Sequence, residues 1–220
     1  MERKGNSNII VAKIGTDTLV RDGKVDDQYA LNIAEQIGRV CASGKSVVLV
    51  SSGARALGGQ WPLTSAWERA FGNNGISSAE ILFREASYKD DLDRVKKALD
   101  SGTVPVVNGD REAYLGEKTT NNDILAAGIA VEIGAGTAFL TTVGGVLDEE
   151  GKLIPKLPRE FEIIDFGKTA HGTGGIGDKV RAARLVAEKG HQALIADGRR
   201  EEVIWHFANG INGFGTRIAA

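Results

Sequence analysis

Short apolar runs that do not alternate with polar residues recur along this chain, and stretches with helical spacing separate them. The runs expected to form strands are 8–15, 46–53, 78–84, 103–109, 136–142 and 192–198. The stretches expected to form helices are 28–43, 88–100, 122–133, 180–189 and 201–208. Continuous apolar strands that alternate with helices are typical of parallel sheets covered on both faces. The sequence therefore predicts an α/β fold with a mostly parallel central sheet.

Composition narrows the class of protein. The 220 residues are 42% apolar and 25% charged, which is ordinary for a globular protein, and the length favours one domain spanning 1–220. A formal net charge of −2 gives no overall attraction to nucleic acid or to an anionic membrane. The single cysteine, Cys41, and three scattered histidines form no metal-ligand pattern. No signal-peptide core and no run of about 18 apolar residues is present, so we expect a cytoplasmic protein.

Glycine-rich pieces follow four of the expected strands. They read KIGTDT, SSGARALGG, NGD and TTVGG, and a fifth piece, GTGGIGDK at 172–179, precedes an expected helix. In open parallel sheets, ligands bind beyond the carboxyl ends of the strands. The positions of these pieces therefore predict a small-molecule site at that edge of the sheet.

Lys13 lies at the end of the first expected strand, inside an apolar run and two residues before Gly15. A lysine is costly to bury unless it is paired, and glycine opens backbone N–H groups nearby. One interpretation is a clamp on a phosphate group. The other is a lysine whose stem is buried while its ammonium reaches water at the strand end.

Two further polar pieces each allow two interpretations. Ser52 and its neighbours precede 54–57, where a helix start would expose N–H groups to an anion, but a serine there also suits a helix N-cap. Asn122 and Asp123 likewise stand where N-caps occur before the buried helix. Capping does not explain the four polar residues 119–122, and Asp123 near two lysines would hold both in register.

The GTGGIGDK segment matches neither common phosphate-binding pattern. A P-loop requires serine or threonine after the lysine, and Val180 follows Lys179; a GxGxxG pattern would need a strand directly before it. The segment is either a plain turn or a different kind of anion site. Lys179 near a helix start opposes the local helix dipole, which favours an anionic ligand there.

Four segments together resemble the amino-acid kinase superfamily, and within it the glutamate 5-kinases. They are VAKIGTDTLV (11–20), VVLVSSGARALGG (47–59), VPVVNGD with TTNNDILAAGIAVEIGA (104–135), and GTGGIGDKVRAARLVAEKGHQALIADG (172–198). They occur in the family's order and cover most of the chain. The resemblance implies a three-layer αβα sandwich formed by one amino-acid kinase domain. As a departure from the family pattern, we expect no C-terminal RNA-binding-type domain. It also implies ATP-dependent phosphorylation of the L-glutamate γ-carboxylate, the first step toward proline.

The resemblance also implies a role for each matching residue. Lys13 and Lys179 are expected to stabilise the transferring phosphate, with Asp123 organising them. Ser52, Asp110 and Asn122 are expected to bind glutamate. The residues expected at ATP are Lys13, Gly15, Thr141, Thr142, Gly172, Thr173, Gly174, Gly175 and Lys179. The partners implied are small-molecule substrates and ATP carrying Mg²⁺, with no metal held by the protein itself, and members of the family form dimers or tetramers.

The expected chemistry agrees with these residue types. A glutamate carboxylate has a pKa near ~4.3 and is ionised at neutral pH, so it needs no general base. It does need help to approach another anion. Two lysines, glycine-loop amides and a nucleotide-bound Mg²⁺ supply that help by positioning and charge stabilisation.

The chain departs from the family pattern at several places. Thr141-Thr142 stands where a Thr-Asp pair is usual, NGD is one residue shorter than the usual NEND-like stretch, and GTGGI replaces GTGGM. The segments after SSGARALGG and before GTGG are short. These changes leave two other interpretations open. One is the same fold and chemistry with a different small acceptor, and the other is a non-catalytic regulatory protein that binds a nucleotide or an amino acid.

Overall fold

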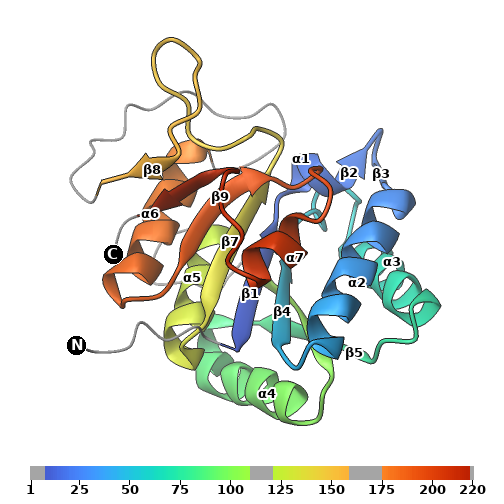
Figure 1. The fold of residues 1–220 in the computed structure, drawn as a ribbon. Coiled ribbons are helices and arrows are strands. Elements are labelled where there is room, and N and C mark those ends of the chain that lie inside the picture. The colour runs from blue at the N-terminus through green and yellow to red at the C-terminus, as the bar shows by residue number, and fades with distance from the viewer. Residues whose placement is uncertain (1–7, 110–120, 159–174, 219–220) are drawn as a thin grey trace.

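The structure is a computed structural model, and it describes residues 8–109, 121–158 and 175–218. Helices cover both faces of a twisted central sheet, which gives three layers (Figure 1). The predicted fold class, a mostly parallel αβα sandwich, is confirmed. Within the described residues, no helix has the length and apolar character needed to cross a membrane.

The large sheet has the strand order β5-β6-β4-β1-β7-β9-β10-β8. Its strands are β1 (Ile9–Ile14), β4 (Ser46–Ser51), β5 (Ser78–Phe83), β6 (Val104–Gly109), β7 (Gly136–Thr141), β8 (Lys156–Leu157), β9 (Ala193–Asp197) and β10 (Thr216–Ile218). From β5 to β9 every neighbouring pair is parallel. Strand β10 runs antiparallel to β9, and β8 is parallel to β10. A separate hairpin pairs β2 (Val20–Arg21) with β3 (Lys24–Val25).

The helices divide between the two faces of the sheet. They are α1 (Thr16–Leu19), α2 (Asp27–Ala42), α3 (Gln60–Asn73), α4 (Tyr88–Asp100), α5 (Asn122–Ile133), α6 (Ile176–Glu188) and α7 (Val203–Ala208), with a 3-10 turn at Glu85–Ser87. One buried cluster joins α2, α3 and α7 to the sheet, and the other joins α4, α5 and α6 to its opposite face. Each face therefore has its own core.

The alternation of side chains along β1 decides on which face Lys13 lies. Ile10, Ala12 and Ile14 belong to the core under α2, whereas Val11 belongs to the core under α5 and α6. Successive side chains of a strand point to opposite faces. Lys13 therefore lies on the same face as Val11, beneath the first turns of α5 and α6.

Most predicted elements occur within a few residues of their expected bounds, and the spacing that predicted α2 is confirmed. Its residues Ala30, Ile33, Ile37 and Val40 are all buried. Both interpretations of Ser52 assumed a helix start at 54–57, but residues 54–58 form a turn closed by the Leu57 N–H on the Gly53 carbonyl. The helix of that region, α3, begins only at Gln60 and was not predicted.

Candidate active site

The carboxyl end of β1 lies at the point where the order of the sheet reverses. From β1 the chain first adds β4 on one side of it, and later places β7 on the other side. Crevices at such reversal points are where open α/β sheets bind ligands. Lys13 is the second-last residue of β1, with Val50 and Phe139 as its neighbours in register. Lys13 therefore lies at the edge of the sheet where such ligands bind.

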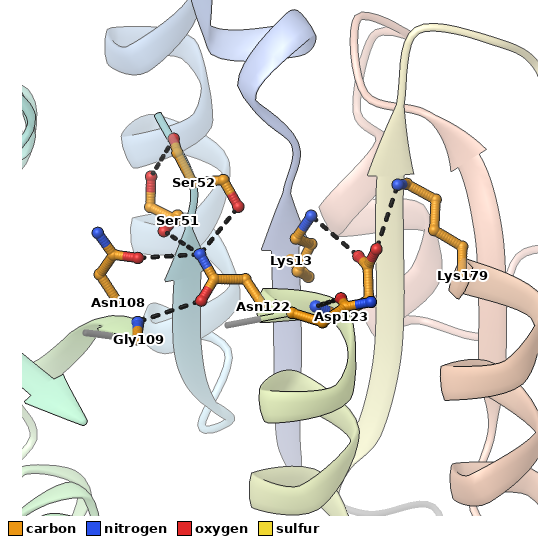
Figure 2. A network of polar contacts seen from close by, with 9 residues as sticks. Lys13, Ser51, Ser52, Asn108, Gly109, Asn122, Asp123 and Lys179 are labelled. Carbon is orange, nitrogen blue, oxygen red and sulfur yellow. Dashed lines mark hydrogen bonds and ion pairs between the residues drawn. The ribbon is translucent and has the colours of Figure 1, made fainter. Parts of the chain in front are cut away.

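Three buried charged side chains meet there, one from each of β1, α5 and α6 (Figure 2). The Lys13 ammonium forms an ion pair with Asp123 Oδ1 at 2.9 Å. Lys179 Nζ donates a hydrogen bond to Asp123 Oδ2 at 3.3 Å. The side chains of the two lysines are 6% and 8% exposed and that of Asp123 is 2% exposed. Asp123 thus forms ion pairs with both ammonium groups.

The charges of these three groups do not cancel. Burial raises the pKa of Asp123, but the charges of Lys13 and Lys179 outweigh burial and hold that pKa below its ordinary value. Burial lowers the pKa of Lys13; the Asp123 carboxylate opposes this effect, and the Lys179 charge adds to it. With both lysines protonated, the trio of Lys13, Asp123 and Lys179 carries one net positive charge in a place that water reaches poorly. An anion bound beside it would relieve that charge.

The backbone adds to the positive potential. Both α5 and α6 begin beside the trio, and helix N-termini carry partial positive charge and unpaired N–H groups. Asn121 caps α5, because its side chain accepts from the Asp123 N–H at 2.9 Å. The interpretation of Asn122 or Asp123 as the N-cap is therefore wrong. Gly175 caps α6 without a side chain, and Lys179 is the fourth residue of that helix.

Asn122 joins the ends of two strands on the other side of Asp123 (Figure 2). Its Nδ2 donates to Asn108 Oδ1 at 2.9 Å, to Ser52 Oγ at 3.0 Å and to the Ser51 carbonyl at 3.3 Å. Its Oδ1 accepts from the Gly109 N–H at 3.1 Å. The predicted residues Ser52 and Asn122 thus lie together, and the hydrogen bonds of Asn122 link α5 to the ends of β4 and β6.

The structure places the other predicted residues at the same edge of the sheet where it describes them. The Gly15 N–H donates to the Leu140 carbonyl at 3.3 Å, and a Cβ added at Gly15 would lie 4.0 Å from Lys13 Nζ. Thr141 ends β7 and is buried, whereas Thr142 is exposed. Asp110, Gly172, Thr173 and Gly174 lie outside the described residues.

Sequence reasoning missed three residues that continue the Asn122 contacts. They are Asn108 on β6, Gln60 at the start of α3 and Glu80 on β5. Asn108 is a polar residue inside an otherwise apolar strand, and that was a usable signal. Gln60 and Glu80 gave none, because only the packing of α3 brings them together. Among the described residues, no three His, Cys, Asp or Glu side chains gather as metal ligands.

Comparison with known proteins gives a consistent result. The model of the amino acid kinase family matches residues 62–197. Glutamate 5-kinase of Kosmotoga olearia is 32% identical over 90% of the chain, and that of Thermotoga maritima is 29% identical over 91%. Glutamate 5-kinase of Pseudomonas entomophila is 34% identical over 88%. The chain spans 65%, 65% and 63% of the lengths of these relatives.

Solved structures with this fold include two kinases. Isopentenyl phosphate kinase superposes with a TM-score of 0.72 at 19% identity, over 96% of this chain and 100% of that one. UMP kinase from Ureaplasma parvum superposes with a TM-score of 0.68 at 17% identity, over 96% and 99%. At these identities the likeness concerns the fold alone.

The sheet topology and the paired lysines define a three-layer α/β protein with a cationic site at the carboxyl edge of its sheet. The family match covers more than half of the chain. This chain belongs to the amino acid kinase family.

Proposed function

We propose that this protein transfers the γ-phosphoryl group of ATP to the γ-carboxylate of L-glutamate, forming γ-glutamyl phosphate, the first step of proline biosynthesis. The observation that carries the proposal is the buried trio, in which one carboxylate holds two ammonium groups at 2.9 and 3.3 Å. Kinship to curated glutamate 5-kinases supports glutamate as the acceptor.

In this reaction a carboxylate oxygen attacks the γ-phosphorus, and the bond to the β–γ bridging oxygen breaks. The products are an acyl phosphate and ADP, and no proton has to move, because the attacking carboxylate is already ionised. The main obstacle is the approach of two anions. In this proposal Lys13 and Lys179 stabilise charge on the transferring group, and their ion pairs with Asp123 keep them at a fixed spacing.

We assign ATP and the acceptor to opposite sides of Asp123. Gly15, Thr141 and the start of α6 form the ATP side, where the N–H groups at the start of α6 and the excess positive charge suit a polyphosphate. Ser52 and Asn122 form the acceptor side. Mg²⁺ would arrive bound to ATP, and it would neutralise charge on the β- and γ-phosphates.

A second candidate keeps the fold and the phosphoryl transfer but changes the acceptor. It is favoured because two kinases that share the fold, isopentenyl phosphate kinase and UMP kinase, are named for acceptors other than glutamate. The described acceptor side also offers the Ser52 hydroxyl and the Asn122 amide, which are groups that bind many acceptors.

An acceptor screen separates the two candidates. ADP release would be measured with MgATP and, in turn, L-glutamate, L-aspartate, isopentenyl phosphate or UMP, with MgATP alone as the background. We expect release above background with L-glutamate and none with the two phosphate acceptors. Release with a phosphate acceptor but not with glutamate would establish the second candidate, and ATP-induced thermal stabilisation without any release would indicate a nucleotide-binding protein.

A further inference from the structure

A directed chain of hydrogen bonds runs from the acceptor side of the site to an exposed carboxylate on strand β5. Asn122 Nδ2 donates to Asn108 Oδ1 at 2.9 Å, and Asn108 Nδ2 donates to Gln60 Oε1 at 2.6 Å. Gln60 Nε2 in turn donates to Glu80 Oε1 at 2.7 Å. The Thr64 hydroxyl donates to the same Glu80 oxygen. We call this chain of contacts, from Asn122 through Asn108 and Gln60 to Glu80, the relay. Every donor in it points toward Glu80.

The two ends of the relay fix its direction. A primary amide has one end that donates and one that accepts, so it fits its neighbours in only one of two orientations. The Glu80 carboxylate only accepts, which forces Gln60 to turn its NH₂ group toward β5. At the other end the Gly109 N–H only donates, which turns Asn122 Oδ1 toward it at 3.1 Å. A reversal anywhere between them would place two donors or two acceptors face to face.

This direction has a consequence at Ser52. Asn122 presents hydrogens, not a lone pair, to Ser52 Oγ at 3.0 Å, so the serine oxygen acts as an acceptor in that contact. The hydroxyl hydrogen of Ser52 then remains available to donate to an anionic substrate. If Asn122 were reversed, its Oδ1 would take that hydrogen instead.

We propose that Glu80 is a positioning residue for the acceptor: through Gln60 and Asn108 it reinforces the orientation of Asn122 that the Gly109 N–H and the Ser51 carbonyl also favour, and so keeps the Ser52 hydroxyl ready to donate to the acceptor carboxylate. This inference rests on the proposed function in one respect, the assignment of the acceptor to the Ser52 side. In this proposal Glu80 acts through Asn122 and not by contact with the substrate.

The test uses three variants of the full chain. Glu80→Lys replaces an acceptor with a donor and opposes the direction of the relay. Glu80→Gln removes the charge but keeps an oxygen that accepts from Gln60 and Thr64. Glu68→Lys is the matched control, because Glu68 lines the same small pocket as Glu80 and Asn108 without belonging to the relay. If Glu80→Lys folds poorly, Glu80→Ala replaces it.

Two measurements are made on each variant. KM is determined separately for L-glutamate and for MgATP, and the side-chain amide signals of Asn122 are followed by ¹⁵N–¹H NMR, assigned by their loss in Asn122→Asp. Glu80→Lys is expected to raise the KM for glutamate roughly 10- to 100-fold, the worth of one hydrogen bond to a charged group. It should leave the KM for MgATP within about twofold and shift the Asn122 signals.

Glu80→Gln and Glu68→Lys should behave like the wild type in both measurements. The proposal is overturned if Glu80→Lys leaves the Asn122 signals in place, raises both KM values alike, or is matched by Glu68→Lys. If the wild-type protein does not turn over glutamate, the proposed function fails instead, and the amide signals alone decide whether Glu80 orients Asn122.

Discussion

Replacing Asp123 by asparagine probes the buried trio directly, because this residue is the shared partner of two ammonium groups. The substitution keeps the shape of the side chain and removes its charge. Lys13 and Lys179 would then face each other, 6% and 8% exposed, without the carboxylate that now lies 2.9 and 3.3 Å away. Removing one partner of a buried ion pair costs about 3–5 kcal/mol. For a chain of this length that corresponds to a fall in Tm of roughly 6–20 °C.

The loss should depend on pH. The pKa of Lys13 lies below its usual value in the folded protein, so at pH values between the folded and unfolded pKa the unfolded chain binds more protons and stability rises with pH. Asp123 opposes this lowering of the Lys13 pKa. Without Asp123 the pKa of Lys13 in the folded protein is lower still, so the pH range over which stability rises with pH begins at a lower pH. The deficit of Asp123→Asn relative to wild type should therefore be smaller at pH 9 than at pH 7.

Urea and thermal unfolding of both proteins at pH 7 and pH 9 give these differences. Asp93→Asn is the control, because Asp93 pairs with Lys96 on the exposed surface of α4 at 3.8 Å and should cost less than about 1 kcal/mol at either pH. An Asp123→Asn protein as stable as this control, or a deficit that grows with pH, would refute the account of the trio.

Lys179→Ala should lower kcat for ADP release by about a thousandfold or more while the protein stays folded, because one of the two ammonium groups that stabilise the transferring phosphate is lost. Steady-state kinetics measures this loss, with thermal unfolding as the control for folding. Robust activity of the variant would contradict the role assigned to Lys179. Gly215→Ala should lower the free energy of unfolding by about 1–3 kcal/mol more than Gly210→Ala. Both glycines have left-handed φ values, +67° and +69°, but an added Cβ lies 2.5 Å from the Ile195 carbonyl at Gly215 and meets nothing within 4 Å at Gly210. Equal urea midpoints for the two variants would show that the close approach at Gly215 is unimportant.

Much of the fold follows from local pattern. The apolar runs that form β1 and β4 are continuous because both faces of the sheet are covered, and α5 is apolar almost all round because it lies between the sheet and its neighbours. Helix α3 was missed for a local reason. Gly58 and Gly59 precede it, and a pair of glycines indicates a turn, although Pro62 in the first turn is compatible with a helix.

The candidate site, like the fold, could be predicted from the sequence only in part. The family resemblance supplied Lys13, Asp123 and Lys179, and the alternation along β1 explains why they meet. The relay from Asn122 to Glu80 could not be predicted, because its Asn108–Gln60 contact joins residues 48 positions apart and depends on how α3 packs on β5 and β6. Side-chain amides of this kind carry no periodicity that marks their partners.

The most direct test of the central claim is to trap the acyl phosphate. Purified protein would be incubated with MgATP, L-glutamate and hydroxylamine, and γ-glutamyl hydroxamate would be measured against the ADP released. The account predicts one hydroxamate per ADP in the presence of L-glutamate, and neither product above background when glutamate is omitted. ADP release that is independent of glutamate, or glutamate-dependent release without hydroxamate, would contradict phosphoryl transfer to the γ-carboxylate.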